Sequence, residues 1–160
     1  MEHVATAAKV NKALVYRYFG NKQRLFEAVM EDQLRSRINV LESLPEELGD
    51  MLTAWFKTTM SDRQFMRLIQ REALEKRGDP VLKAKREEYY DRQIGILREL
   101  QRAGRVTDRF SPDALFCLLL CVVVGPAAFP QVMAMSYRKK KPFEESYTEA
   151  LQELAELLKP

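Results

Sequence analysis

A short segment near the N-terminus, Val4–Phe26, limits most strongly what this chain can fold into. Its residue pattern predicts two short helices joined by a tight turn, followed by a glycine break and the start of a third helix. All of its charged side chains are basic, because no acidic residue lies between Glu2 and Glu27. A small helix-turn-helix unit that presents only positive charge is suited to binding a polyanion, and DNA is the obvious one.

The second of these helices is predicted over Lys12–Phe19. Asn11 precedes it and has a side-chain oxygen that can accept from a backbone N–H of the first turn, as an N-cap does. Val15 and Phe19 lie at i, i+4 spacing and form the expected buried face. The residues expected to read bases are Lys12, Ala13, Leu14 and Arg17, and those expected to hold phosphates are Tyr16, Tyr18 and Lys22.

The same segment, KVNKALVYRYFGNKQRLFEAV, resembles the signature of the tetracycline-repressor (TetR) family of bacterial transcription regulators. The positions that match the family pattern are Val10, Lys12, Val15, Tyr16, Tyr18, Phe19, Lys22 and Leu25. Lys9 stands where the family usually has a turn glycine, so a non-glycine residue must take the turn conformation at a cost of about 1 kcal/mol. The resemblance implies an all-α fold, with a helix-turn-helix DNA-binding head on a helical-bundle body that binds a ligand and dimerises.

The family places one further helix before the helix that begins near Glu2, and the sequence starts at Met1 without it. The resemblance divides the chain into residues 1–30, an N-terminally incomplete helix-turn-helix DNA-binding domain, and residues 31–160, an effector-binding and dimerisation domain. A head without this helix is expected to lack part of its core. An alternative function is therefore a dimeric helical sensor or interaction module without competent DNA binding.

Hydrophobic residues recur at helical spacing through the rest of the chain, and no stretch shows sustained strand alternation. With 46% hydrophobic and 31% charged residues the chain has the composition of a globular protein, and its net charge of +3 makes the basic segment a local feature. Further helices are expected over Gln23–Leu44, from Pro45, from Ser61 or Asp62 to near Gly78, from Asp79-Pro80 to Gly104, from Ser111-Pro112-Asp113, and over Phe143–Leu158.

The segment Ala114–Tyr137 carries no charge and is long enough to cross a bilayer, and the basic cluster Arg138–Lys141 follows it. A membrane-anchored helical protein is therefore a second alternative. Gly125-Pro126 and Pro130 are expected to interrupt the helix, which favours burial in a homodimer over a membrane. The resemblance places the last two helices in the dimer interface, with Leu118, Val122, Phe129, Tyr147, Leu151, Leu154 and Leu158 as candidate contacts.

The sequence offers no set of residues for catalysis or metal binding. His3 is the only histidine and lies in the expected head. Cys117 and Cys121, at i, i+4, are expected to be small buried hydrophobic residues. We therefore expect no enzyme, no cofactor and no metal site, and a protein of the bacterial cytoplasm that acts at the nucleoid.

The resemblance also implies a small-molecule effector of unknown identity, which binds among the middle helices and releases a repressor from a palindromic operator. The side chains that could line its pocket are Trp55, Phe56, Met60, Phe65, Met66, Ile69, Tyr89, Tyr90 and Phe116. The seven methionines and the aromatic residues favour a hydrophobic or flat aromatic effector. Arg67, Arg71 and Arg92 could pair with an anionic one. Ordinary core positions and surface ion pairs explain these residues as well.

Overall fold

The computed structural model describes residues 1–41, 45–75, 78–138 and 140–160. The described residues form α-helices and no strand, which confirms the all-α fold class. The helices are α1 (Glu2–Ala7), α2 (Lys12–Phe19), α3 (Lys22–Leu41), α4 (Leu48–Ser61), α5 (Arg63–Glu75), α6 (Lys83–Arg102), α7 (Pro112–Ala128), α8 (Pro130–Ser136) and α9 (Phe143–Leu157).

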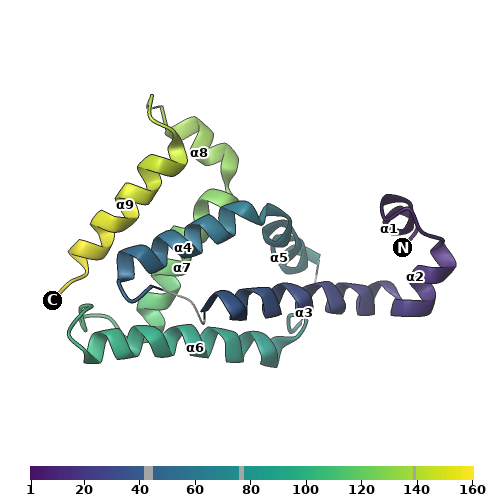
Figure 1. Ribbon diagram of the computed structural model, residues 1–160, viewed down its shortest axis with the longest axis horizontal. Helices are drawn as coiled ribbons and strands as arrows, with labels where there is room; N and C mark the ends of the chain where they lie inside the picture. Colours follow the sequence, from purple (N-terminus) through teal and green to yellow (C-terminus); the bar gives the residue numbers. More distant parts are fainter. Residues whose placement is uncertain (42–44, 76–77, 139) are drawn as a thin grey trace.

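The first two helices form a small head at one end of the molecule, and α3 joins this head to the body (Figure 1). α3 begins after Asn21, whose Oδ1 accepts from the Arg24 N–H at 2.9 Å. Its middle part packs on α5 and α6 through a small hydrophobic cluster, in which Met30 is fully buried beside Phe65 and Val81. This cluster is separate from the main core. α3 therefore joins the head to the body through hydrophobic contacts that the main core does not share.

The main hydrophobic core lies between α4, α6, α7 and α9. α4 runs through the middle of the body and packs against both α7 and α9 (Figure 1). The fully buried side chains Leu52, Phe56, Leu97, Leu119 and Leu151 come from all four helices. Burial of each of these side chains stabilises the folded protein by about 1.5–3 kcal/mol. The four helices therefore form a stable frame, and α3 and α5 lie beside it.

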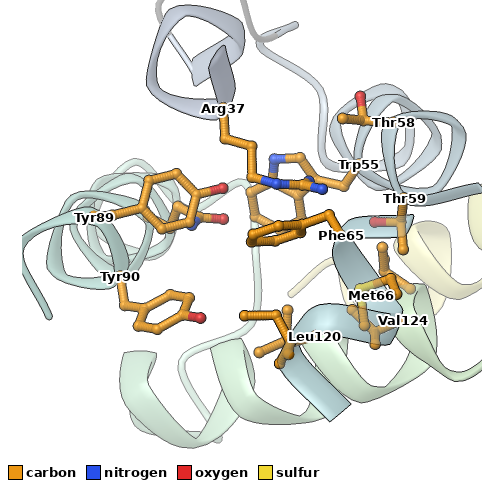
Figure 2. Close-up of a pocket in the computed structure, with 13 residues that line it drawn as sticks. Arg37, Trp55, Thr58, Thr59, Phe65, Met66, Tyr89, Tyr90, Leu120 and Val124 are labelled. Atoms are coloured by element: carbon orange, nitrogen blue, oxygen red, sulfur yellow. The ribbon is translucent and has the colours of Figure 1, made fainter. Parts of the chain in front are cut away.

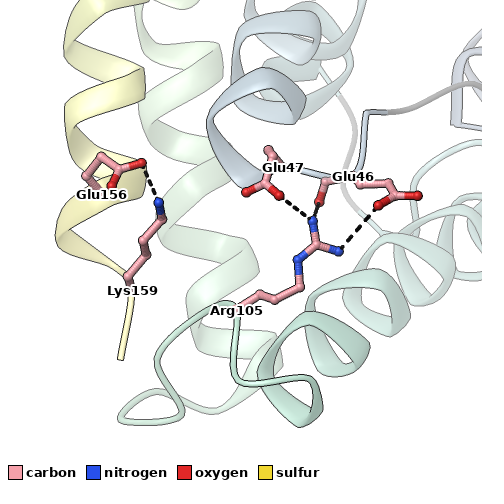
Figure 3. A network of polar contacts seen from close by, with 5 residues as sticks. All are labelled: Glu46, Glu47, Arg105, Glu156 and Lys159. Atoms are coloured by element: carbon pink, nitrogen blue, oxygen red, sulfur yellow. Dashed lines mark hydrogen bonds and ion pairs between the residues drawn. The ribbon is translucent and has the colours of Figure 1, made fainter.

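α4 begins later than the sequence predicts. Pro45 does not open it, since the helix starts at Leu48 with Glu47 in extended conformation before it. Arg105, in the loop between α6 and α7, donates to the Glu46 carbonyl oxygen at 2.7 Å and to the Glu47 carboxylate at 2.8 Å (Figure 3). These contacts hold the approach to α4 outside the helix and tie Glu46 to a loop residue 59 positions away in sequence, which no local pattern could indicate.

α6 also begins later than predicted, because Asp79-Pro80 is followed by a turn rather than by the helix. Leu82 precedes the helix with a left-handed φ of 56°, which is strained for a non-glycine residue. Glu72 of α5 holds this turn, since its carboxylate accepts from the Val81 N–H at 2.7 Å and pairs with Arg86 Nη1 at 2.7 Å. Both side chains of the pair are buried. The pair therefore fixes α5 against the start of α6.

The starts of α5 and α7 follow the sequence. Asp62 caps α5, because its Oδ1 accepts from the Phe65 N–H at 3.1 Å. Ser111 caps α7 in the same way. The predicted end of the third helix at Leu44 lies outside the described residues, as does Lys139 of the basic cluster.

α7 continues through Gly125-Pro126, where the sequence predicts an interruption, and ends at Ala128. Pro126 has no N–H for the Val122 carbonyl, but the Tyr147 hydroxyl of α9 donates to that oxygen at 2.7 Å instead. The break comes at Phe129, where α8 leaves at 85°. Across the described ranges no single helix is long and apolar enough to cross a bilayer, and only the bent pair α7–α8 has the length and composition.

Candidate DNA-binding head and effector cavity

α2 buries one edge and leaves the rest of its surface open to solvent. Asn11 caps it as predicted, with its Oδ1 accepting from the Ala13 N–H at 2.8 Å. Val15 is buried and Phe19 is half-buried, so this edge faces the neighbouring helices. The predicted DNA-contacting residues are exposed except for Leu14, which is half-buried: they are Lys12, Ala13, Tyr16, Arg17, Tyr18 and Lys22.

The turn before α2 has the backbone conformation that the family pattern predicts. Lys9 takes a φ of 54°, in the left-handed region that glycine normally occupies. Lys12 lies 3.4 Å from the Glu2 carboxylate, and both side chains are largely exposed. Such a surface ion pair is weak and screened by salt, so it does not prevent Lys12 from meeting a phosphate or a base. The head therefore offers a basic, solvent-facing helix at the end of the molecule.

A cavity of about 170 Å³ lies in the body, between α3, α4, α5, α6 and α7 (Figure 2). Six of the nine residues proposed for the effector pocket line it: Trp55, Phe65, Met66, Ile69, Tyr89 and Tyr90. Phe56 and Met60 line another depression, because they lie on the side of α4 that faces α9. Phe116 lies in the core, with its ring 6.4 Å from that of Trp55 in an edge-on arrangement. These three residues do not line the cavity.

The polar part of the cavity wall could not be predicted from the sequence and consists of Arg37, Thr58, Thr59 and Gln93. Arg37 comes from α3, and its guanidinium lies 4.1 Å over the Phe65 ring while Nη2 pairs with Asp62 at 3.3 Å. Nothing in the sequence distinguishes Arg37 from Arg35 two residues earlier, because only the packing of α3 on the body decides which of them faces inward. Leu120, Val123 and Val124 of α7 complete the apolar wall.

The arginines proposed for an anionic effector lie elsewhere. Arg67, Arg71 and Arg92 are exposed, and none of them lines the cavity. Arg71 pairs with Glu75 at 2.6 Å, and Arg92 pairs with Glu88 at 2.7 Å, each one turn along its own helix. They are surface ion pairs. Of the described residues that line the cavity, Arg37 alone is charged.

Tyr89 and Tyr90 add hydroxyl groups to the wall (Figure 2). Burial raises the pKa of the Tyr89 hydroxyl, and the nearby positive charge of Arg37 only partly offsets this. Tyr89 is therefore a neutral phenol at physiological pH and can donate a hydrogen bond. The cavity combines an apolar, aromatic interior with a small number of hydrogen-bond donors, as small-molecule sites typically do.

The outer side of α7 and α8 is apolar and exposed. Leu118 is 53% and Phe129 is 59% exposed. Cys117 and Cys121 are also exposed, contrary to the prediction of burial, because the body covers only the opposite side of α7. Of the other proposed interface residues, Leu151 is 1% exposed within one protomer and has no surface left for a partner. The remaining four are half-buried: Val122, Tyr147, Leu154 and Leu158.

Two family models match the chain. The model described as "Bacterial regulatory proteins, tetR family" matches residues 1–29, and the "Tetracyclin repressor-like, C-terminal domain" matches residues 47–156, more than half of the chain. This chain belongs to the TetR family. Its members are DNA-binding transcription regulators.

One relative and one solved structure are similar to this chain. The HTH-type transcriptional repressor SCO4008 of Streptomyces coelicolor is 30% identical over 135 residues, which cover 82% of this chain and 69% of the relative. The crystal structure of the putative transcriptional regulator SCO4942 of Streptomyces coelicolor superposes with a TM-score of 0.82, over 99% of this chain and 86% of that one. At 22% identity, this second likeness shows the fold alone.

Proposed function

We propose that this TetR-family chain is a homodimeric repressor that binds a palindromic operator and releases it when a small molecule occupies the cavity in its body. The observation that carries the proposal is the exposed basic face of α2 at the end of the molecule. A recognition helix must present side chains that reach base edges in the major groove, and Lys12 and Arg17 are suited to this by length and charge. The protein would act in the bacterial cytoplasm, at the nucleoid.

The homodimer is proposed to form through the outer side of α7 and α8, together with α9. Leu118 and Phe129 are large apolar side chains whose exposure is unfavourable in a monomer. An isologous dimer would place two heads related by a two-fold axis, and a two-fold protein reads a palindromic site. Repression, rather than activation, is proposed because the relative SCO4008 is named a transcriptional repressor.

The response to a small molecule is proposed from the place of the cavity. α3 contributes Arg37 to the cavity wall and, at its other end, follows directly on the head. A ligand that contacts Arg37 can therefore shift α3, the helix that positions α2. Release of DNA requires that the ligand bind the non-binding arrangement of the heads more tightly than the DNA-bound one.

The proposed function is tested by selecting genomic fragments with the purified chain at about 50 mM and 200 mM salt. We expect one short palindrome to be enriched, with retention falling steeply as salt rises, because phosphate contacts release counterions. Arg98→Ala, an exposed substitution on α6, should leave the enriched sequence unchanged. Sequence-blind retention at both salt concentrations would contradict the proposal and favour a dimeric sensor or interaction module.

A further inference from the structure

The cavity in the body has a mixed chemistry that restricts what can occupy it. Most of its wall is apolar or aromatic, and Arg37 brings a guanidinium group to one side (Figure 2). Among the described residues of the wall none is acidic. The volume of about 170 Å³ is close to the roughly 150 Å³ of an apolar protein cavity that takes up benzene. One or two aromatic rings with a small substituent are therefore of the right size.

Two donors in this wall have no acceptor: Nε of Arg37 and Nε1 of Trp55. Most buried donors in native proteins are paired, so two unpaired ones beside the same cavity call for an acceptor from outside the chain. The Tyr89 hydroxyl points toward the guanidinium end of Arg37 and is a third donor (Figure 2). A ligand that matches this wall carries acceptor atoms and negative charge at one end and an apolar ring at the other.

We propose that the cavity binds a small aromatic carboxylate, with its ring against Phe65, Met66 and Leu120 and its carboxylate against Arg37 and Trp55. The inference rests on the proposed function, since it names the chemical class of the effector for that same site. The planar guanidinium group can donate two parallel hydrogen bonds to a carboxylate, and such charge-assisted pairs are the strong ones. A neutral amide of the same shape lacks the charge and gains much less.

Asp62 is the competitor for Arg37 within the protein. Its Oδ2 lies 3.3 Å from Arg37 Nη2, and the two side chains join α3 to the start of α5. A ligand carboxylate that draws the guanidinium group toward the cavity weakens this pair. Because α3 leads to the head, exchange of Asp62 for the ligand is the step through which occupancy of the cavity reaches the DNA-binding surface.

The test compares acids with their amides on the full chain. Benzoate, phenylacetate and 2-naphthoate are titrated by calorimetry beside benzamide, phenylacetamide and 2-naphthamide. We expect at least one acid to bind about tenfold or more tightly than its amide. Trp55 is the only tryptophan, so a change in its fluorescence with benzoate places the ligand in this cavity. The assignment is overturned if no acid binds, or if every acid binds only as well as its amide.

Two substitutions separate charge recognition from folding. Arg37→Met keeps an unbranched apolar stem without the guanidinium group and should weaken binding of the acid about tenfold or more, and binding of the amide much less. Asp62→Asn retains an oxygen to cap α5 but removes the competing charge, so it should strengthen binding of the acid. Arg67→Gln, exposed on α5, is the control that should change neither. If Asp62→Asn binds the acid as well as or more weakly than the original protein, the role proposed for Arg37 is wrong. This result decides the question even if Arg37→Met does not fold.

The ligand titrations contain no DNA. They therefore test the ligand class independently of the proposed DNA binding. Preference for an acid in a protein without specific DNA binding supports the ligand class and contradicts the regulator. Specific operator binding by a protein that recognises no acid overturns the ligand class and leaves the regulator intact.

Discussion

Single side chains explain features of this protein that the helical pattern of the sequence does not. Tyr147 is an example, because its hydroxyl takes the place of the N–H that Pro126 lacks and donates to the Val122 carbonyl. Burial raises the pKa of Tyr147, so the hydroxyl remains a donor across the physiological range. This one contact lets α7 continue through a proline and joins it to α9.

Tyr147→Phe should therefore destabilise the protein by about 1–2 kcal/mol, since it leaves the partly buried Val122 carbonyl oxygen without a partner. Urea denaturation followed by circular dichroism measures the change in the free energy of unfolding. Tyr18→Phe removes an exposed hydroxyl from α2 and serves as the control. Equal stability of the two variants would mean that Tyr147 contributes no hydrogen bond to α7.

The two proposed kinds of DNA contact are also separable at single residues. Arg17→Ala should cost about 1–3 kcal/mol on the cognate operator and relax specificity at one base position. Lys22→Ala should instead weaken binding to all sequences alike and reduce the salt dependence. Fluorescence anisotropy on a set of operator variants compares them. The assignment of Arg17 to bases and Lys22 to phosphates is wrong if both variants lose the same affinity on every duplex.

At the scale of helices, the joint between α5 and α6 depends on the buried pair of Glu72 and Arg86. Glu72→Ala should cost about 3–5 kcal/mol, because it leaves the Arg86 charge buried without a partner and frees the Val81 N–H. The matched control is Glu75→Ala, which removes an exposed pair with Arg71 from the same helix and should leave stability nearly unchanged. Thermal and urea denaturation measure both. A small effect of Glu72→Ala would show that other contacts hold α6 in place.

Helix ends show which parts of the fold the sequence could predict. Asn11, Asp62 and Ser111 cap helices through contacts within three residues, and the sequence predicted all three starts. α4 and α6 begin later than predicted because Arg105 and Glu72, distant in sequence, hold the preceding residues outside the helix. Local chemistry is readable from one sequence, whereas contacts between distant elements are not.

The same distinction applies to the candidate sites. The head lies in one continuous segment, so pattern and spacing predicted α2 and its cap. The cavity is assembled from five helices, and the sequence could suggest aromatic residues for it but not Arg37. Cys117 and Cys121 were expected inside, since α7 is apolar on all sides, yet composition does not tell which side of such a helix meets its own chain.

At the scale of the whole molecule, the exposed apolar side of α7 and α8 is the clearest sign of a second subunit. Leu118→Glu should convert a dimer into a monomer, because it places a charge in the proposed interface. Light scattering coupled to gel filtration measures the mass. Leu74→Glu, at an 88% exposed position on α5, is the control and should leave the mass unchanged. If Leu118→Glu remains a dimer, the interface does not lie on the outer side of α7 and α8.

We propose that two heads on one dimer read one palindrome. The most direct measurement is an anisotropy titration of the selected palindrome, one half-site and a scrambled duplex at several salt concentrations. We predict two protomers per palindrome, binding about a thousandfold or more tighter than to the scrambled duplex, and weaker binding to the half-site. Equal affinity for all three duplexes, at every salt concentration, would mean that the protein does not read a palindrome.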